Sequence, residues 1–246
     1  MPVAIITGAS KGLGRALATA LAERGWDLVL DARTGPVLED AAREARKYGT
    51  RVVAVAGDVT DAAHRAELVA AARGLGGLDL LVNNASALGA EPLVRLEDLP
   101  VEGLRAALET NVVAALGLVR EALPLLRAAG GGVHGEGGGP GGAVVSVSSD
   151  AAVEAYETWG GNGASKAALD HLSAVLAAEE PGLRVWAVDP GDMRTDLYAA
   201  AVPDDAARRP EPASVVPAFL RLLDVRPRPA SGRYTASALL ELEAGR

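Results

Sequence analysis

The chain has 246 residues, of which 49% are hydrophobic, and its formal net charge is −8. This length and composition favour one large globular domain, and the acidic balance argues against nucleic-acid binding, which needs a basic surface. Because the sequence contains no cysteine, disulfides, thiolate catalysis and cysteine-ligated metal sites are excluded.

The sequence shows neither a signal peptide nor a membrane-spanning segment. The first residues, Met1-Pro2-Val3, lack the basic region and apolar core of a signal peptide. The longest apolar run, around residues 112–119, is far shorter than the roughly 18 residues of a spanning helix. The histidines, His64, His134 and His171, lie far apart without metal-ligand spacing. We therefore expect a soluble cytoplasmic protein with no metal site.

Short apolar runs alternate with amphipathic stretches along the whole chain. We expect strands over residues 3–6, 27–31, 51–56, 78–82, 142–147, 183–188 and 233–236. We expect helices over residues 13–23, 35–48, 62–73, 101–129, 163–179 and 212–224. This alternation predicts a single α/β domain over residues 1–246, a Rossmann-type doubly wound parallel sheet of about seven strands with helices on both faces. The glycine-rich residues 130–142 predict a mobile loop on the side away from the ligand crevice.

The stretch from Thr7 to Gly14, Thr-Gly-Ala-Ser-Lys-Gly-Leu-Gly, lies directly between the first strand and the first helix. Gly8 permits a tight turn, Gly12 lets a ligand approach bare backbone, and Gly14 lets the helix pack closely on the strand. The N-terminus of the helix directs free N–H groups and its positive dipole end at the same place. A pyrophosphate is the ligand that this arrangement favours.

With Thr7 in front, this stretch resembles the cofactor loop of the short-chain dehydrogenase/reductase family, and three later segments match the same family. Asp58-Val59 resembles the pair that holds the adenine ring, and Asn83-Asn84-Ala85-Ser86 resembles the family's Asn-Asn-Ala-Gly stretch. Residues 190–195, Pro-Gly-Asp-Met-Arg-Thr, resemble the segment that covers the nicotinamide. The resemblance spans nearly the whole chain and implies a substrate lid over about residues 192–211. The cofactor contacts that it implies are Gly8, Ser10, Lys11, Gly12, Leu13, Gly14, Arg33, Asp58, Val59, Asn83, Ala85, Lys166, Pro190, Gly191, Met193 and Thr195.

The end of the second strand indicates which nicotinamide cofactor is bound. The family's acidic position, whose carboxylate accepts from the ribose hydroxyls, falls at Ala32. Arg33 follows and Lys11 lies in the glycine loop, so two cations are available to a 2′-phosphate. Asp31 would repel that phosphate, but strand alternation directs its side chain to the face opposite to that of Ala32. We therefore favour NADP(H) over NAD(H).

The resemblance also implies four catalytic positions. Asn111 matches the asparagine that anchors a water, Ser149 the serine that orients the substrate oxygen, and Lys166 the lysine that lowers the pKa of a proton-donating tyrosine. That tyrosine should lie four residues before Lys166 and 13 residues after Ser149. Both spacings lead to Asn162.

An amide at this position changes the expected chemistry, because it can donate a hydrogen bond but not a proton. General acid catalysis contributes ~10²–10⁴-fold, so we expect a loss of that size unless another group substitutes. Tyr156 and Tyr198 are the candidate substitutes, although neither has the one-turn relation to Lys166.

Three functions remain open at this point. The first is an NADPH-dependent carbonyl reductase or alcohol dehydrogenase impaired at Asn162, whether that residue is natural or introduced. The second is a cofactor-binding protein without turnover, and the third is a non-redox dehydratase or isomerase. Small and acidic residues around the expected pocket favour a neutral or cationic organic substrate. The resemblance further implies a homodimer or homotetramer formed by residues 101–129 and 163–179, with an apolar surface that includes Val113, Leu116, Val119, Leu169, Leu172 and Leu176.

Overall fold

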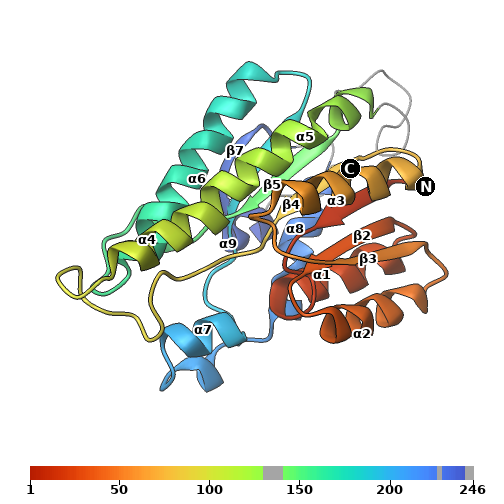
Figure 1. Cartoon of the computed structure of the whole chain (residues 1–246). Helices are drawn as coiled ribbons and strands as arrows, with labels where there is room; N and C mark the ends of the chain where they lie inside the picture. The colour runs from red at the N-terminus through yellow and green to blue at the C-terminus, as the bar shows by residue number, and fades with distance from the viewer. Residues whose placement is uncertain (130–140, 226–228, 242–246) are drawn as a thin grey trace.

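The computed structural model describes residues 1–129, 141–225 and 229–241. Within these ranges seven strands form one sheet in the order β3-β2-β1-β4-β5-β6-β7 (Figure 1). All neighbouring strands are parallel, which confirms the predicted doubly wound α/β fold. The strands are β1 (Val3–Ile6), β2 (Asp27–Ala32), β3 (Val52–Ala56), β4 (Leu80–Asn83), β5 (Ala143–Val147), β6 (Arg184–Asp189) and β7 (Gly232–Thr235).

Helices cover both faces of the sheet because alternate strand residues point to opposite sides. In β1, Ile6 packs in a cluster with Leu17 of α1 and Phe219 of α8, whereas Ile5 packs in a second cluster with Leu68 and Leu118 on the other face. The helices are α1 (Gly12–Glu23), α2 (Gly35–Arg46), α3 (Ala62–Leu75), α4 (Val101–Leu108), α5 (Ala114–Ala128), α6 (Gly160–Glu179), α7 (Asp196–Ala201), α8 (Val216–Asp224) and α9 (Ala236–Glu241).

Three helical segments differ from the sequence-based expectation. The helix expected over residues 101–129 contains a π-helical turn, Glu109–Val113, between α4 and α5. Helix α6 begins at Gly160 rather than at residue 163. The stretch 212–224 divides into a 3-10 turn, Pro212–Ser214, and α8, which restarts with a proline in its first turn. Helices α7 and α9 have only six residues each, too short to give a clear periodic signal.

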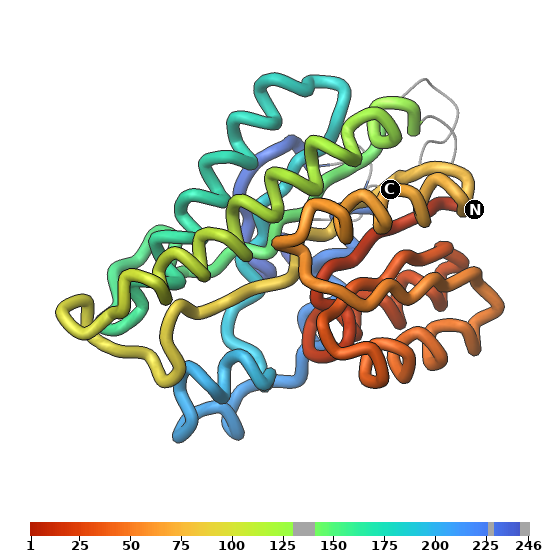
Figure 2. The backbone as a smooth tube through the Cα atoms, in the orientation of Figure 1, coloured from red at the N-terminus to blue at the C-terminus, as the bar shows by residue number. Residues whose placement is uncertain are grey.

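Because all the strands are parallel, their carboxyl ends lie at the same edge of the sheet. β1 has β2 on one side and β4 on the other, so the chain order reverses between β1 and β4; ligands of open α/β sheets bind at this switch point. Figure 2 shows the chain after β4 and the segment around α7 approaching the same edge, and both line one cavity there.

Sequence-based expectations also concern the glycine-rich loop and the apolar segments. Most of the predicted loop 130–142 lies outside the described residues, which resume at Gly141. In the part of the chain that the structure describes, no helix has the length and apolar character needed to span a bilayer.

Candidate active site

A cavity of about 260 Å³ opens at the carboxyl ends of the central strands. It brings together segments that are far apart in the sequence: the glycine loop, the residues after β4, the end of β5, α6 and residues 189–201. The predicted site residues that line it are Gly8, Lys11, Gly12, Leu13, Ala85, Ser149, Asn162, Lys166, Pro190, Gly191, Met193 and Thr195. Ser10, Gly14, Arg33, Asp58, Val59, Asn83 and Asn111 are not among its lining residues.

The glycine loop has the backbone that its sequence predicts. Gly8 and Gly12 have φ angles of 62° and 53°, a left-handed conformation that glycine adopts without strain. A Cβ on Gly14 would lie 2.5 Å from the carbonyl oxygen of Gly8, so only glycine permits this close packing. The side chain of Lys11, the N-cap residue of α1, makes no capping hydrogen bond to the first amides of that helix. Gly12 and Leu13, in its first turn, border the cavity. The loop therefore fits a pyrophosphate.

Asn84 fixes the glycine loop to the end of β4, a role that the sequence did not reveal. Its Nδ2 donates to the carbonyl oxygens of Thr7 (2.8 Å) and Gly8 (3.1 Å). The hydroxyl of Thr7 in turn accepts from the backbone N–H groups of Asn84 and Ala85. These reciprocal bonds tie the glycine loop to the end of β4.

Asp31 lies beneath the same loop and is buried. One carboxylate oxygen is 2.6 Å from Nε2 of His64 on α3, and the other accepts from the N–H of Gly8 at 3.3 Å. Burial raises the pKa of Asp31, and the hydrogen bond with His64 opposes that effect. Ala32 packs in the cluster on the α1 side of the sheet, so the two neighbours do face opposite ways. The carboxylate of Asp31 is therefore bonded to His64 and to the glycine loop.

Arg33, which is expected at the adenosine end of the cofactor, has an exposed side chain. The pKa of Asp58 is lowered mainly by the backbone N–H of Thr60, and the charge of Arg33 contributes to the same direction. Lys11 is bonded to Asp196 at the start of α7, with 2.6 Å between Nζ and Oδ2.

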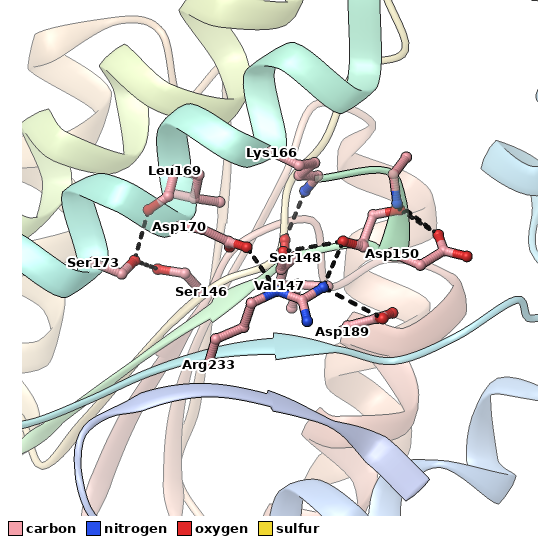
Figure 3. A network of polar contacts seen from close by, with 12 residues as sticks. Ser146, Val147, Ser148, Asp150, Lys166, Leu169, Asp170, Ser173, Asp189 and Arg233 are labelled. Carbon is pink, nitrogen blue, oxygen red and sulfur yellow. Dashed lines mark hydrogen bonds and ion pairs between the residues drawn. The ribbon is translucent and has the colours of Figure 1, made fainter. Parts of the chain in front are cut away.

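Lys166 and Asn162 lie one turn apart on α6, are buried, and both face the cavity. Lys166 Nζ donates to the carbonyl oxygen of Val147 at 2.7 Å (Figure 3). Burial lowers the pKa of Lys166 to about 8, and the charge of Asp170 partly offsets this. Asn162 makes a long bond, 3.4 Å, from Nδ2 to the carbonyl oxygen of Ala87.

Asn111 supports the site from behind rather than lining it. The π-helical turn directs its side chain at Ala87, whose N–H and carbonyl it bonds at 2.8 Å and 2.9 Å. Its Nδ2 also donates to Ser165 Oγ at 2.7 Å. One buried amide thus joins the segment after β4 to α6.

The two candidate substitutes for a tyrosine acid are already engaged with carboxylates. Tyr156 OH donates to Asp150 at 3.1 Å, and this bond raises the pKa of Tyr156. Tyr198 OH donates to Asp205 at 2.8 Å, and burial together with that bond raises its pKa to about 12. A raised pKa makes each phenol a poorer acid. Ser149 Oγ donates to the same Asp150 at 3.0 Å.

Comparison with known proteins agrees with this geometry. The model of the family described as "short chain dehydrogenase" matches residues 2–206. The chain belongs to this family. It is 37% identical over 216 residues to cis-4-hydroxycyclohexanecarboxylate dehydrogenase of Sinomonas cyclohexanicum, covering 85% of this chain and 81% of that protein.

Two further proteins, one known by its sequence and one by its structure, are similar to this chain. The chain is 36% identical over 213 residues to sepiapterin reductase of Meriones unguiculatus, covering 81% of this chain and 77% of that protein. Among solved structures, an alcohol dehydrogenase from the archaeon Thermococcus sibiricus complexed with 5-hydroxy-NADP has a TM-score of 0.83 and 26% identity, covering 96% of this chain and 95% of that chain. The protein is accordingly an oxidoreductase of the short-chain dehydrogenase type.

Proposed function

We propose that this short-chain dehydrogenase is an NADP(H)-dependent oxidoreductase acting on a small carbonyl or alcohol substrate, with its turnover limited by Asn162. The observation that carries the proposal is the single cavity shared by the glycine loop, Lys166 and the turn at Pro190-Gly191. When bound, the nicotinamide cofactor supplies or accepts the hydride. The acidic and aromatic side chains of Asp150, Trp159 and Tyr198 on the cavity wall favour a neutral or cationic organic substrate.

The chain's own residues divide the remaining work. The first amides of α1 hold the pyrophosphate, and Lys166 holds the nicotinamide ribose. Ser149 orients the substrate oxygen. In the reductive direction that oxygen must take up a proton, which Asn162 cannot release because an amide does not ionise in water. The ammonium of Lys166, one turn away with a pKa of about 8, is the acid on the same helix.

Three observations support NADP(H) over NAD(H). Ala32 offers no carboxylate to the ribose hydroxyls, and the exposed Arg33 follows it. The carboxylate of Asp31 already bonds to His64 and to the N–H of Gly8, so it is not available to the ribose hydroxyls. The archaeal alcohol dehydrogenase with the similar fold carries an NADP derivative. For Lys11 to reach a 2′-phosphate as well, it must exchange Asp196 for that ligand.

A second candidate is a cofactor-binding member of the family without redox turnover. Asn162 favours it, because the side chain is 3% exposed and already bonds to Ala87, as a structural amide would.

The test is oxidation of NADPH and of NADH with a panel of ketones and aldehydes, by the protein and by Asn162→Tyr. We expect the tyrosine variant to gain ~10²-fold or more with NADPH, because it restores a general acid. Asn162→Phe is the matched control, since it adds the ring without the hydroxyl and should gain nothing.

The other possible outcomes would contradict parts of this proposal. If both proteins bind NADPH but neither oxidises it, the second candidate is favoured. Fast turnover by the unmodified protein would mean that Lys166 or a further group donates the proton without limiting the rate, so that Asn162 does not impair the enzyme. Equal use of NADH would contradict the cofactor preference.

We also propose a homodimer or homotetramer formed through α5 and α6. A groove of about 90 Å³ between these helices is lined by Leu116, Leu172, Val175 and Leu176, among others, and Leu116 is 44% exposed. Two residues expected on this surface, Val119 and Leu169, also line the groove but are largely buried, at 6% and 4% exposure. They pack inward because their helices must also cover the sheet.

A further inference from the structure

Arg233 on β7 reaches into the back of the candidate active site (Figure 3). Its Nε donates to Asp170 Oδ2 at 2.9 Å, and its Nη2 donates to the carbonyl oxygen of Ser149 at 2.9 Å. The same Nη2 is 3.5 Å from Asp189 Oδ2. The side chain is 27% exposed, and its two carboxylate partners only 13% and 8%. One planar guanidinium therefore holds three separate segments, a geometry that suits arginine and not lysine.

Each of these segments carries a part of the site. Ser149 is the residue expected to orient the substrate oxygen. Asp189 ends β6 and accepts from the N–H of Gly191 at 2.9 Å, which fixes the turn expected to cover the nicotinamide. Asp170 lies on α6 one turn beyond Lys166 and therefore on the same face of that helix.

Arg233 also affects the charge balance around Lys166. The charge of Asp170, on the same helix, acts on Lys166, and Asp150 after β5 and Asp189 at the end of β6 line the same cavity as Lys166. Arg233 is the cation that faces Asp170 and Asp189. Asp170 Oδ1 is buried without a hydrogen-bond partner among the described residues. A buried carboxylate with a free oxygen attracts any nearby cation. With Arg233 bound to Asp170, the Lys166 ammonium stays on the carbonyl of Val147.

We propose that Arg233 is a positioning residue of this active site. It fixes the main chain of Ser149 and the turn at Gly191, and it neutralises Asp170 so that Lys166 remains directed at the cavity. Arg233 acts through these residues and does not itself line the cavity described above. It lies beyond residue 206, where the match to the family ends. The role rests on the proposed function, because the nicotinamide end of the cofactor is what these segments would hold.

The test compares two probes that differ in their nicotinamide end. NADPH occupies both halves of the site, whereas adenosine 2′,5′-bisphosphate reaches only the glycine loop and Arg33. We expect Arg233→Met to weaken NADPH binding about ten-fold or more, the size of losing hydrogen bonds to charged groups, and to leave binding of the bisphosphate within about two-fold.

A matched control is available at the opposite edge of the sheet. Arg51 holds the fully buried Asp27 with two nitrogens and also donates to the carbonyl of Leu75. Arg51→Met should lower the unfolding temperature as Arg233→Met does but leave the binding of both probes unchanged. If Arg233→Met does not fold, Arg233→Lys serves the comparison. Lysine keeps the positive charge but lacks the planar guanidinium, so Arg233→Lys should weaken NADPH binding less than Arg233→Met does and leave bisphosphate binding unchanged. Adding Asp170→Asn to Arg233→Met should recover part of the NADPH affinity, because it removes the uncompensated carboxylate.

The outcomes separate the two proposals. Equal weakening of both probes, or of neither, would overturn the positioning role while the proposed function stands. Failure of the unmodified protein to bind either probe would refute the proposed function, and the positioning role with it.

Discussion

Lys166 is a charged side chain in a place that strongly disfavours charge. It is 4% exposed, and its ammonium donates to one carbonyl, that of Val147. Burial lowers its pKa from 10.5 to about 8, so the ammonium form is less stable in the folded protein than in the unfolded chain. The burial of this charge therefore lowers the stability of the folded protein.

This unfavourable burial gives the stability of the protein a defined pH dependence. Below about pH 8 both states hold the proton and the penalty is full, on the order of 3 kcal/mol. Between the two pKa values the folded protein has released the proton while the unfolded chain keeps it, so the penalty declines as pH rises. We expect Lys166→Met to be more stable than the parent protein at pH 7 by up to that amount, and the gain to fade towards pH 10.5.

Urea denaturation of both proteins at pH 7 and pH 10 measures this difference. Lys47→Met is the control: Lys47 is exposed and ends α2, so its loss should have no such pH dependence. A variant less stable than the parent at pH 7 would mean that the bond to Val147 outweighs the burial of the charge.

At this scale the sequence predicts local relations between residues but not contacts between distant ones. The four-residue step from Asn162 to Lys166 is a local property of a helix, and the structure indeed places both side chains on the cavity. The pairing of His64 with Asp31 joins residues 33 positions apart, and that of Arg233 with Ser149 joins residues 84 apart. No local pattern encodes such contacts, because they exist only once the sheet has assembled.

At the scale of elements, the glycine loop and α1 behave as one unit with two distinct requirements. Gly14 is required for packing, since an added Cβ would lie 2.5 Å from a backbone oxygen and 2.6 Å from Asn84 Nδ2. Gly12 is required for its positive φ and for access, since its added Cβ would meet only the end of the Thr195 side chain, at 3.2 Å.

We therefore expect the two alanine substitutions to separate stability from binding. Gly14→Ala should cost about 1–3 kcal/mol of stability, as overpacking does. Gly12→Ala should cost about 1–2 kcal/mol, the strain of a left-handed alanine, and should weaken NADPH binding disproportionately. Thermal unfolding and NADPH titration measure the two effects.

Gly25→Ala provides the reference for strain alone. Its φ is +80° and an added Cβ would contact nothing within 4 Å, so it should lose stability without losing affinity. If Gly12→Ala keeps full NADPH affinity, the loop does not hold the pyrophosphate as proposed.

Element boundaries show where local pattern stops being informative. Every strand expected from the apolar runs is present, because buried parallel strands have near-continuous apolar sequences. The π-helical turn Glu109–Val113 was not foreseen. Its sequence, Glu-Thr-Asn-Val-Val, consists mostly of weak helix formers but contains no signal specific to a π-helical turn. What distinguishes the turn is the set of hydrogen bonds between Asn111 and both Ala87 and Ser165.

At the scale of the whole molecule, the uncovered side of α5 and α6 bears on assembly. Val113, Leu116 and Val175 are 49%, 44% and 38% exposed, and contiguous exposed apolar surface often marks an interface. We expect Leu116→Glu with Val175→Glu to convert an oligomer to a monomer, because two buried charges would have no partners across the interface.

Analytical ultracentrifugation of the parent and the double variant measures this change in mass. Tyr48→Glu is the control, since Tyr48 is similarly exposed, at 46%, but follows α2. A parent protein that sediments as a monomer would contradict the proposed assembly.

The three tryptophans of the chain have a practical consequence for optical measurements. Trp186 is fully buried and Trp26 is 7% exposed, so their emission should report the integrity of the core. Trp159 lines the cavity and is the emitter that an incoming ligand would quench. Intrinsic fluorescence can thus follow occupancy and unfolding in one sample, and Trp159→Phe would silence the first signal while leaving the second.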